Sequence, residues 1–148
     1  MNNTVQSTFV SPSNTKSTLH RFGRTGSLVV GSLFALSILL QVFLAGGGIF
    51  ASATWWPMHT VFGMTIILLP VVFLILAWIG RLGRTSLWLS GLAILLVAIQ
   101  SVLVTLPATL GVPGLSALHP VNALIIFGLS LWLAQEVWQG VRGDRLPV

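Results

Sequence analysis

Cysteine is absent from the 148 residues of this sequence, and only two residues are acidic, Glu136 and Asp144. The lack of thiols excludes disulfides, thiolate metal sites, iron–sulfur clusters and haem attached through thioether bonds. Two acids near the C-terminus leave no candidates for paired general acid–base catalysis or for a hard-metal site rich in carboxylates. The sequence also contains no Ser/His/Asp set and no glycine-rich phosphate loop.

Charge of either sign is scarce as well. Charged residues make up 6% of the chain, hydrophobic residues make up 55%, and the mean hydropathy is +0.97. This composition lies outside the range of soluble globular domains and indicates an integral membrane protein. No polar stretch is long enough to form a second, soluble domain, so the sequence predicts one compact bundle in a lipid bilayer.

Four apolar runs are long enough to cross a hydrocarbon core of about 30 Å, which needs roughly 20 helical residues. They lack the period-2 alternation of barrel strands, and helices satisfy their own backbone hydrogen bonds in lipid. The predicted helices lie near residues 27–45, 58–79, 87–106 and 118–138. The predicted fold class is an all-α membrane protein, a four-transmembrane-helix up-down bundle.

Basic residues all fall on one side of this topology. They precede the first helix, connect the second to the third and follow the fourth: Lys16, Arg21, Arg24, Arg81, Arg84, Arg142 and Arg145. The other two loops, 46–57 and 107–117, carry no charge. The positive-inside rule therefore predicts cytoplasmic tails at 1–24 and 141–148 around a transmembrane domain at 25–140, in a prokaryotic cytoplasmic membrane. Orientation and phospholipid contact account for the net charge of +5, so nucleic acid is not an expected partner.

Three local features carry further expectations. Residues 1–18, rich in Ser, Thr and Asn, are expected to form a weakly ordered tail. The run Gly46-Gly47-Gly48 is expected to form a flexible outer turn. Pro70 lies inside the second predicted helix, where it frees the carbonyl of Ile66, so a kink is predicted there.

An internal repeat relates the first pair of helices to the second. Gln41 precedes His59 by eighteen residues, and Gln100 precedes His119 by nineteen. Both glutamines fall in the outer third of an outward-running helix, and both histidines begin an inward-running one. Each histidine is followed by the pattern x-Val-x-small, which ends at Gly63 and at Ala123. The bundle is thus predicted to consist of two repeated hairpins related by an axis along the membrane normal.

This repeat predicts that His59 and His119 face each other at one depth, because the second and fourth helices of an up-down bundle lie on a diagonal. Neighbouring helices at 8–10 Å imply a diagonal of roughly 11–14 Å, which suits a metal ion bonded by an imidazole from each side. We therefore predict a planar macrocycle, haem b, with His59 and His119 as axial metal ligands. Gln41 and Gln100 are the predicted supporting hydrogen-bonding residues, and Gly63 and Ala123 leave room for the ring.

A four-helix unit with one histidine on its second helix and another on its fourth resembles one half of haem A synthase, across residues 27–138. In that family such a histidine pair holds a stable b-type haem, so the resemblance implies this role for His59 and His119. The catalytic half of that enzyme carries a glutamate shortly before its helix-2 histidine. Here Trp56 occupies the third position before His59, so the resemblance is to the haem-holding half.

Two looser similarities exist. The segment LHPVNALIIFGLSLWLA, residues 118–134, is similar to a signature of small, uncharacterised four-helix bacterial membrane proteins. Cytochrome b561-type proteins are an analogy only, because they use four histidines for two haems.

Three function classes stay open at this stage. The first is a b-type cytochrome that transfers electrons near the outer face, alone or with a redox partner. The second is a cofactor-free accessory subunit that packs against other membrane subunits. The third is a small transporter or a quinone-binding module that uses the same histidines and glutamines. His20 stands beside Arg21 and is expected to be solvated on the cytoplasmic side.

Overall fold

The structure, a computed structural model, describes the backbone of residues 12–143 and the side chains of residues 18–142. Helices follow one another along this part of the chain with short connections, and no strand occurs in it. The elements are α1 (Pro12–Phe50), α2 (Trp55–Ile66), α3 (Leu68–Ile79), α4 (Arg84–Thr109), the short 3-10 helix η1 (Pro113–Ala117) and α5 (Leu118–Gly143). The predicted all-α fold is confirmed.

Four helical stretches within the described residues are long and apolar enough to cross a membrane: Thr18–Phe50, Trp55–Ile79, Arg84–Thr109 and Pro113–Arg142. Helices α2 and α3 together form the second of these stretches. Large apolar side chains cover their outward faces, as lipid contact requires. The chain is therefore a multi-pass, four-helix membrane bundle, as the sequence predicted.

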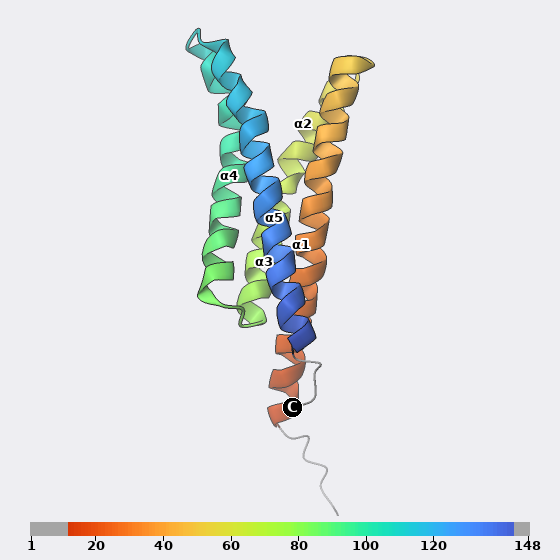
Figure 1. Cartoon of the computed structure of the whole chain (residues 1–148), viewed down its shortest axis with the longest axis vertical. Helices are drawn as coiled ribbons and strands as arrows, with labels where there is room; N and C mark the ends of the chain where they lie inside the picture. The colour runs from red at the N-terminus through yellow and green to blue at the C-terminus, as the bar shows by residue number, and fades with distance from the viewer. Residues whose placement is uncertain (1–11, 144–148) are drawn as a thin grey trace, which may run out of the picture.

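The helices alternate in direction, and each packs against two neighbours in the bundle (Figure 1). Helices α3 and α5 both contact α1 and α4, so the second and fourth spans lie on a diagonal, as predicted. We call the end that carries the α1–α2 and α4–η1 turns the histidine end, and the opposite end the arginine end. Toward the histidine end the α1–α2 pair and the α4–α5 pair diverge, which gives the bundle a V shape (Figure 1).

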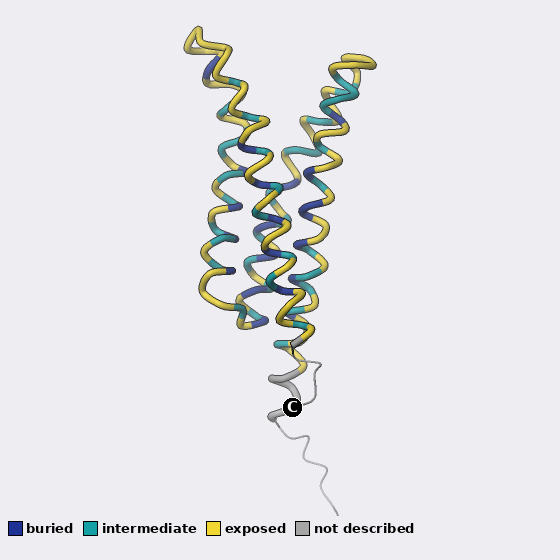
Figure 2. Tube along the Cα trace, viewed as in Figure 1, coloured by how far each residue is buried: buried dark blue, intermediate teal, exposed yellow. Residues whose placement is uncertain are grey.

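The core occupies the lower and middle parts of this V. Buried residues face inward along all four spans, whereas both tips are largely exposed (Figure 2). One core cluster lies below the histidine end and consists of Phe34, Ile38, Ile66, Ala93, Val97 and Ile126. A second, nearer the arginine end, consists of Phe73, Ala77, Leu133 and Val137. The upper cluster closes the floor of the space between the diverging pairs.

Small residues bring the helices close together near the arginine end. A Cβ atom built on Gly23 in α1 would overlap the backbone of Gly80, at the end of α3. Ser27, one turn further along α1, is fully buried and donates its hydroxyl hydrogen to the Gly23 carbonyl at 2.8 Å. Close backbone approach through small residues is the usual means of helix association in lipid, where burial of apolar surface gives no driving force. This contact fixes the arginine end.

Several predicted boundaries were wrong. Helix α1 begins at Pro12, inside the tail that was expected to be weakly ordered, and residues 1–11 lie outside the described part. The predicted turn at Gly46-Gly47-Gly48 is helical, because α1 continues to Phe50. Its glycines instead admit tryptophans: a Cβ on Gly47 would lie 2.6 Å from the Trp55 ring, and one on Gly48 would lie 2.6 Å from the Trp56 ring.

The later helices also run past the residues that were expected to end them. Helix α4 continues through Pro107 to Thr109, since a proline in the last turn removes only one hydrogen bond. Helix α5 continues through Gly140 to Gly143, so the first part of the predicted C-terminal tail is helical, and residues 144–148 lie outside the described part.

The predicted kink in the second span is confirmed. The helix is interrupted at Ile67, between α2 and α3. Pro70 is buried three residues later and has no N–H to donate to the Ile66 carbonyl, which accounts for the break. The fourth span contains no such interruption between Leu118 and Gly143.

Replacing Gly23 with alanine should destabilise the bundle by about 1–3 kcal/mol, because the added methyl group forces α1 and α3 apart. Gly128→Ala in α5 is the matched control, since a Cβ there meets no atom within 4 Å. Alanine also has the better helix propensity, so this control should be neutral or slightly stabilised. Unfolding in mixed detergent micelles measures both, and equal stability of the two variants would contradict the proposed contact.

Candidate functional site

Each histidine is tied to the preceding helix by the same hydrogen bond. His59 Nδ1 lies 3.1 Å from the backbone carbonyl oxygen of Gln41, and His119 Nδ1 lies 3.2 Å from that of Gln100. A carbonyl oxygen only accepts, so Nδ1 carries the ring proton in both residues. The neutral ring then has its lone pair on Nε2, which faces away from the bonded helix. The two halves of the predicted repeat therefore form equivalent hydrogen bonds in the structure.

The two rings contact each other across the bundle. Their centroids are 6.2 Å apart, and the ring planes make an angle of 65°. His59 and His119 thus lie at the same depth on opposite walls, as predicted. They come from α2 and α5, which are far apart in the sequence.

This separation can be compared with the geometry of a metal ion held from two sides. An imidazole nitrogen bonds a first-row metal ion such as zinc at about 2.0–2.1 Å. The bonding nitrogen lies about 1.1 Å from the ring centre, so two opposed imidazoles place their centroids about 6.2–6.4 Å apart. The observed 6.2 Å fits this value. The angle between the ring planes does not affect the fit, because each ring can rotate about the axis that passes through the ion.

The rings lie in a cleft of about 560 Å³ between the diverging helix pairs. All six residues predicted for the site line it, from α1, α2, α4 and α5: Gln41, His59, Gly63, Gln100, His119 and Ala123. The other walls are mainly apolar, and no Asp, Glu, Lys or Arg side chain lines the cleft. Ile38, Ile66, Val97 and Ile126 of the upper core cluster form its floor.

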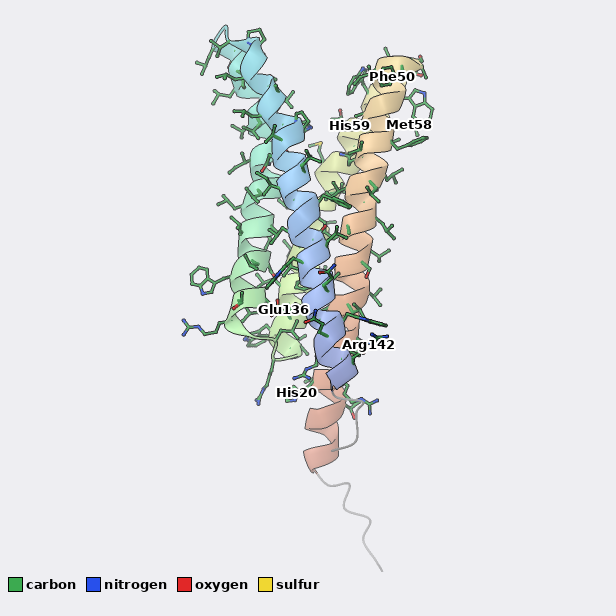
Figure 3. All side chains as sticks on the ribbon, viewed as in Figure 1. His20, Phe50, Met58, His59, Glu136 and Arg142 are labelled. Carbon is green, nitrogen blue, oxygen red and sulfur yellow. The ribbon has the colours of Figure 1, made fainter. Side chains whose placement is uncertain are left out.

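Three other ionisable side chains lie at the opposite end of the bundle from the cleft. His59 lies at the histidine end of α2, whereas Glu136, Arg142 and His20 lie toward the arginine end (Figure 3). No group of three or more His, Cys, Asp or Glu side chains that could hold a metal ion occurs among the described residues. Among the described residues, the candidate ligands in the cleft are therefore a pair of histidines and not a complete metal-binding group.

The glutamine side chains differ between the two halves. The Gln100 Oε1 atom accepts a hydrogen bond of 2.9 Å from Asn122 Nδ2, which also donates to the Leu96 carbonyl at 2.9 Å. The Gln41 Oε1 atom is buried and has no hydrogen-bond partner. Gln41 and Gln100 were predicted to support the histidines through their side chains; in the structure their backbone carbonyls, not their amides, bind the histidine rings.

Gly63 has a role that the sequence did not indicate. A Cβ atom at this position would overlap the amide nitrogen of Gln41. The room left by Gly63 is therefore taken up, at least in part, by the Gln41 side chain. Its counterpart Ala123 has a Cβ, and there Gln100 turns to Asn122 instead.

Two further residues around the histidines were missed by sequence analysis. Asn122 is only 7% exposed and stands on α5 one turn after His119. An amide buried in an apolar transmembrane helix was the available signal. Trp56 packs edge-on against the His59 ring, with centroids 5.7 Å apart, and lines the cleft.

Substituting Gly63 with alanine should cost about 1–3 kcal/mol of stability, because the new methyl group displaces the Gln41 amide. Gln41→Ala alone should be neutral or stabilising, since it removes a buried amide oxygen that lacks a partner. The double variant should recover most of the loss. A double-mutant cycle on detergent-solubilised protein measures the coupling, and strictly additive effects would show that the two side chains do not compete for this space.

Comparison with known proteins gives one match. The model of a family of unknown function, DUF6220, matches residues 41–106, which is less than half of the chain. The matched region runs from Gln41 through α2 and α3 into α4, so it includes His59 and Gln100 but ends before His119. No curated protein and no solved structure matches the chain.

Proposed function

We propose that this protein is a b-type cytochrome that binds one haem b between His59 and His119 and transfers electrons within the membrane. The observation that carries this proposal is the 6.2 Å separation of the two ring centroids, which equals the centroid separation of two imidazoles that bond one metal ion from opposite sides. The haem would supply one-electron redox chemistry. His59 and His119 would hold it as axial ligands.

The cleft supports a macrocycle over a bare metal ion. Two imidazoles leave most coordination positions of a first-row metal ion unfilled, and no third His and no Cys, Asp or Glu side chain lines the cleft. A porphyrin brings four nitrogen ligands of its own. The volume of about 560 Å³ lies within the range of cofactor sites, and the mainly apolar walls suit the faces of the ring and keep water from it.

The hydrogen bonds to Nδ1 prepare both histidines for this role. Metal-bound histidines usually donate their second N–H group to a carbonyl or carboxylate, which fixes the tautomer and the orientation of the ring. The carbonyls of Gln41 and Gln100 serve this purpose here. Both rings therefore present a lone pair to the cleft with no cost of reorientation.

Electron transfer is favoured over catalysis at the metal. When two histidines occupy both axial positions, no position is left for a substrate. No carboxylate lines the cleft, which agrees with the absence of the glutamate found in the catalytic half of haem A synthase. We propose that the resemblance to that enzyme reflects a shared haem-holding bundle and not haem A synthesis.

A quinone site is less well supported by the same hydrogen bonds. The carbonyl oxygens of a quinone are acceptors and need donors on the protein. With the ring protons committed to backbone carbonyls, both Nε2 atoms are also acceptors.

For orientation, we propose that the arginine end faces the cytoplasm of a prokaryotic cell and that the histidine end faces outward. The arginines of the described part lie at the start of the first span, at the connection between the second and third, and at the end of the fourth, which is the distribution that the positive-inside rule describes. A redox partner would then meet the uncharged outer turns. Other membrane subunits would contact the exposed apolar helix faces.

Purified wild-type protein should show the Soret and α-bands of a low-spin, bis-histidine haem. His59→Ala and His119→Ala should each abolish the low-spin signature, because each removes an axial ligand. His20→Ala is the control and should match the wild type, since His20 lies toward the opposite end of the bundle. Optical and electron paramagnetic resonance spectra measure the outcome. A colourless wild-type protein that takes up no haem on titration, and that co-purifies with other subunits, would replace the cytochrome proposal by that of an accessory subunit.

The proposed orientation can be tested with single cysteines, because the chain has none of its own. Ser52→Cys, in the α1–α2 turn, and Gly114→Cys, in η1, should react with a membrane-impermeant maleimide on intact cells. Gly83→Cys, between α3 and α4, should react only after the membrane is opened. The reverse pattern would invert the proposed topology and would leave the haem proposal unaffected.

A further inference from the structure

We infer that the two histidines are unequal ligands: Asn122 is a positioning residue that makes His119 the firmly held ligand, and His59 is the one that exchanges. This inference rests on the proposed function, since it concerns how the two histidines hold the haem. It is carried by the hydrogen bonds and helix geometry that differ between the two halves of the repeat.

The His119 side is cross-linked around the ligand. Asn122 Nδ2 donates to the Leu96 carbonyl and to Gln100 Oε1, both at 2.9 Å. Leu96 stands one turn before Gln100 on α4, so these bonds join α5 to the helix turn whose carbonyl orients His119. Ser116 adds a bond of 3.3 Å from its hydroxyl to the Val104 carbonyl. The chain is thus bonded to α4 on both sides of His119, through Ser116 in η1 and through Asn122 in α5.

The His59 side lacks this support. Phe62 occupies the position equivalent to Asn122 and has no polar group, and the Gln41 amide oxygen is left buried without a partner. Among the described residues of α1 and α2, the bond from His59 to the Gln41 carbonyl is the one side-chain hydrogen bond between these two helices. The α1–α2 pair is instead held together at the histidine end by apolar packing of Trp55 on Gly47 and of Trp56 on Gly48.

The helix that carries His59 is also interrupted and its counterpart is not. The break at Ile67 lies about two turns below His59, so α2 is a short segment joined to α3 at a point without regular hydrogen bonding. Helix α5 runs unbroken below His119. A small tilt of α2 about this break moves the His59 ring along the cleft, whereas the same movement of His119 breaks the two Asn122 bonds.

The test begins with the haem-loaded, full-length protein, using apomyoglobin as a trap for released haem and carbon monoxide as the probe of ligand exchange. His59→Gly and His119→Gly are compared, each with imidazole in solution to fill the space that the side chain leaves. We expect His119→Gly to lose haem at least about tenfold faster than His59→Gly. Reduced wild-type protein should bind carbon monoxide, which replaces the His59 imidazole without transfer of electrons or protons, and its spectrum should match that of His59→Gly with carbon monoxide.

Asn122 is tested separately. Asn122→Ala should raise the rate of haem loss by about tenfold, the usual effect of removing a group that orients a metal ligand. Asn122→Gln, which keeps the amide, should recover part of this loss. Ser130→Ala is the matched control on α5, because the Ser130 hydroxyl bonds the Phe127 carbonyl of its own helix at 2.7 Å and not α4. Circular dichroism in detergent verifies that each variant is folded.

The outcomes separate this inference from the proposed function. Equal rates of haem loss from the two histidine variants, faster loss from His59→Gly, or an Asn122→Ala variant that matches Ser130→Ala would overturn the inequality and leave the cytochrome intact. A wild-type protein that holds no haem would overturn both. Phe62→Asn offers an independent check, since an amide placed beside Gln41 should slow carbon monoxide binding to the reduced protein several-fold, and an unchanged or faster rate would count against the inference.

Discussion

The hydrogen bond from a histidine Nδ1 to a backbone carbonyl of the preceding span is the interaction on which the site depends. It is made twice, by His59 to Gln41 and by His119 to Gln100. In an apolar bundle an imidazole N–H group without a partner is costly, and the carbonyl both satisfies it and turns the opposite nitrogen into the cleft. Each hairpin thereby presents one lone pair at a fixed depth. The diagonal packing of the second and fourth spans brings the two together.

The helices of the bundle pack closely at the arginine end and diverge at the histidine end. Near the arginine end, Gly23, Ser27 and Gly80 let α1 and α3 approach closely, and the lower core cluster fills the space among the helices. Toward the histidine end the helix pairs diverge, and the cleft begins above the upper core cluster. Because small residues rather than hydrophobic burial hold helices together in lipid, the closed end can be rigid while the open end accommodates a ligand.

The two halves have kept the geometry of the histidines and changed the residues around them. A phenylalanine at 62 and an asparagine at 122 occupy equivalent positions, and the helix break at Ile67 occurs in one half alone. A two-fold repeat of equal halves would hold a flat, nearly symmetrical ring equally on both faces. If the proposed haem is bound, these differences give it a firmly held side at His119 and a more compliant side at His59.

The sequence by itself determined the class of protein, the four spans, the Pro70 kink and six of the residues that line the cleft. Apolar length, proline chemistry and the Gln–His spacing are local properties that a linear pattern records. Helix ends were less predictable: Gly46-Gly47-Gly48 remains helical because Trp55 and Trp56, from the next helix, cover it. Only the tertiary structure decided which atoms make the contacts. Gln41 and Gln100 bind the histidine rings through their backbone carbonyls. Gly63 leaves room for the Gln41 amide, and Asn122 joins α5 to α4. These are contacts between helices, and their geometry depends on rotation and depth in the bundle, which no single segment of sequence contains.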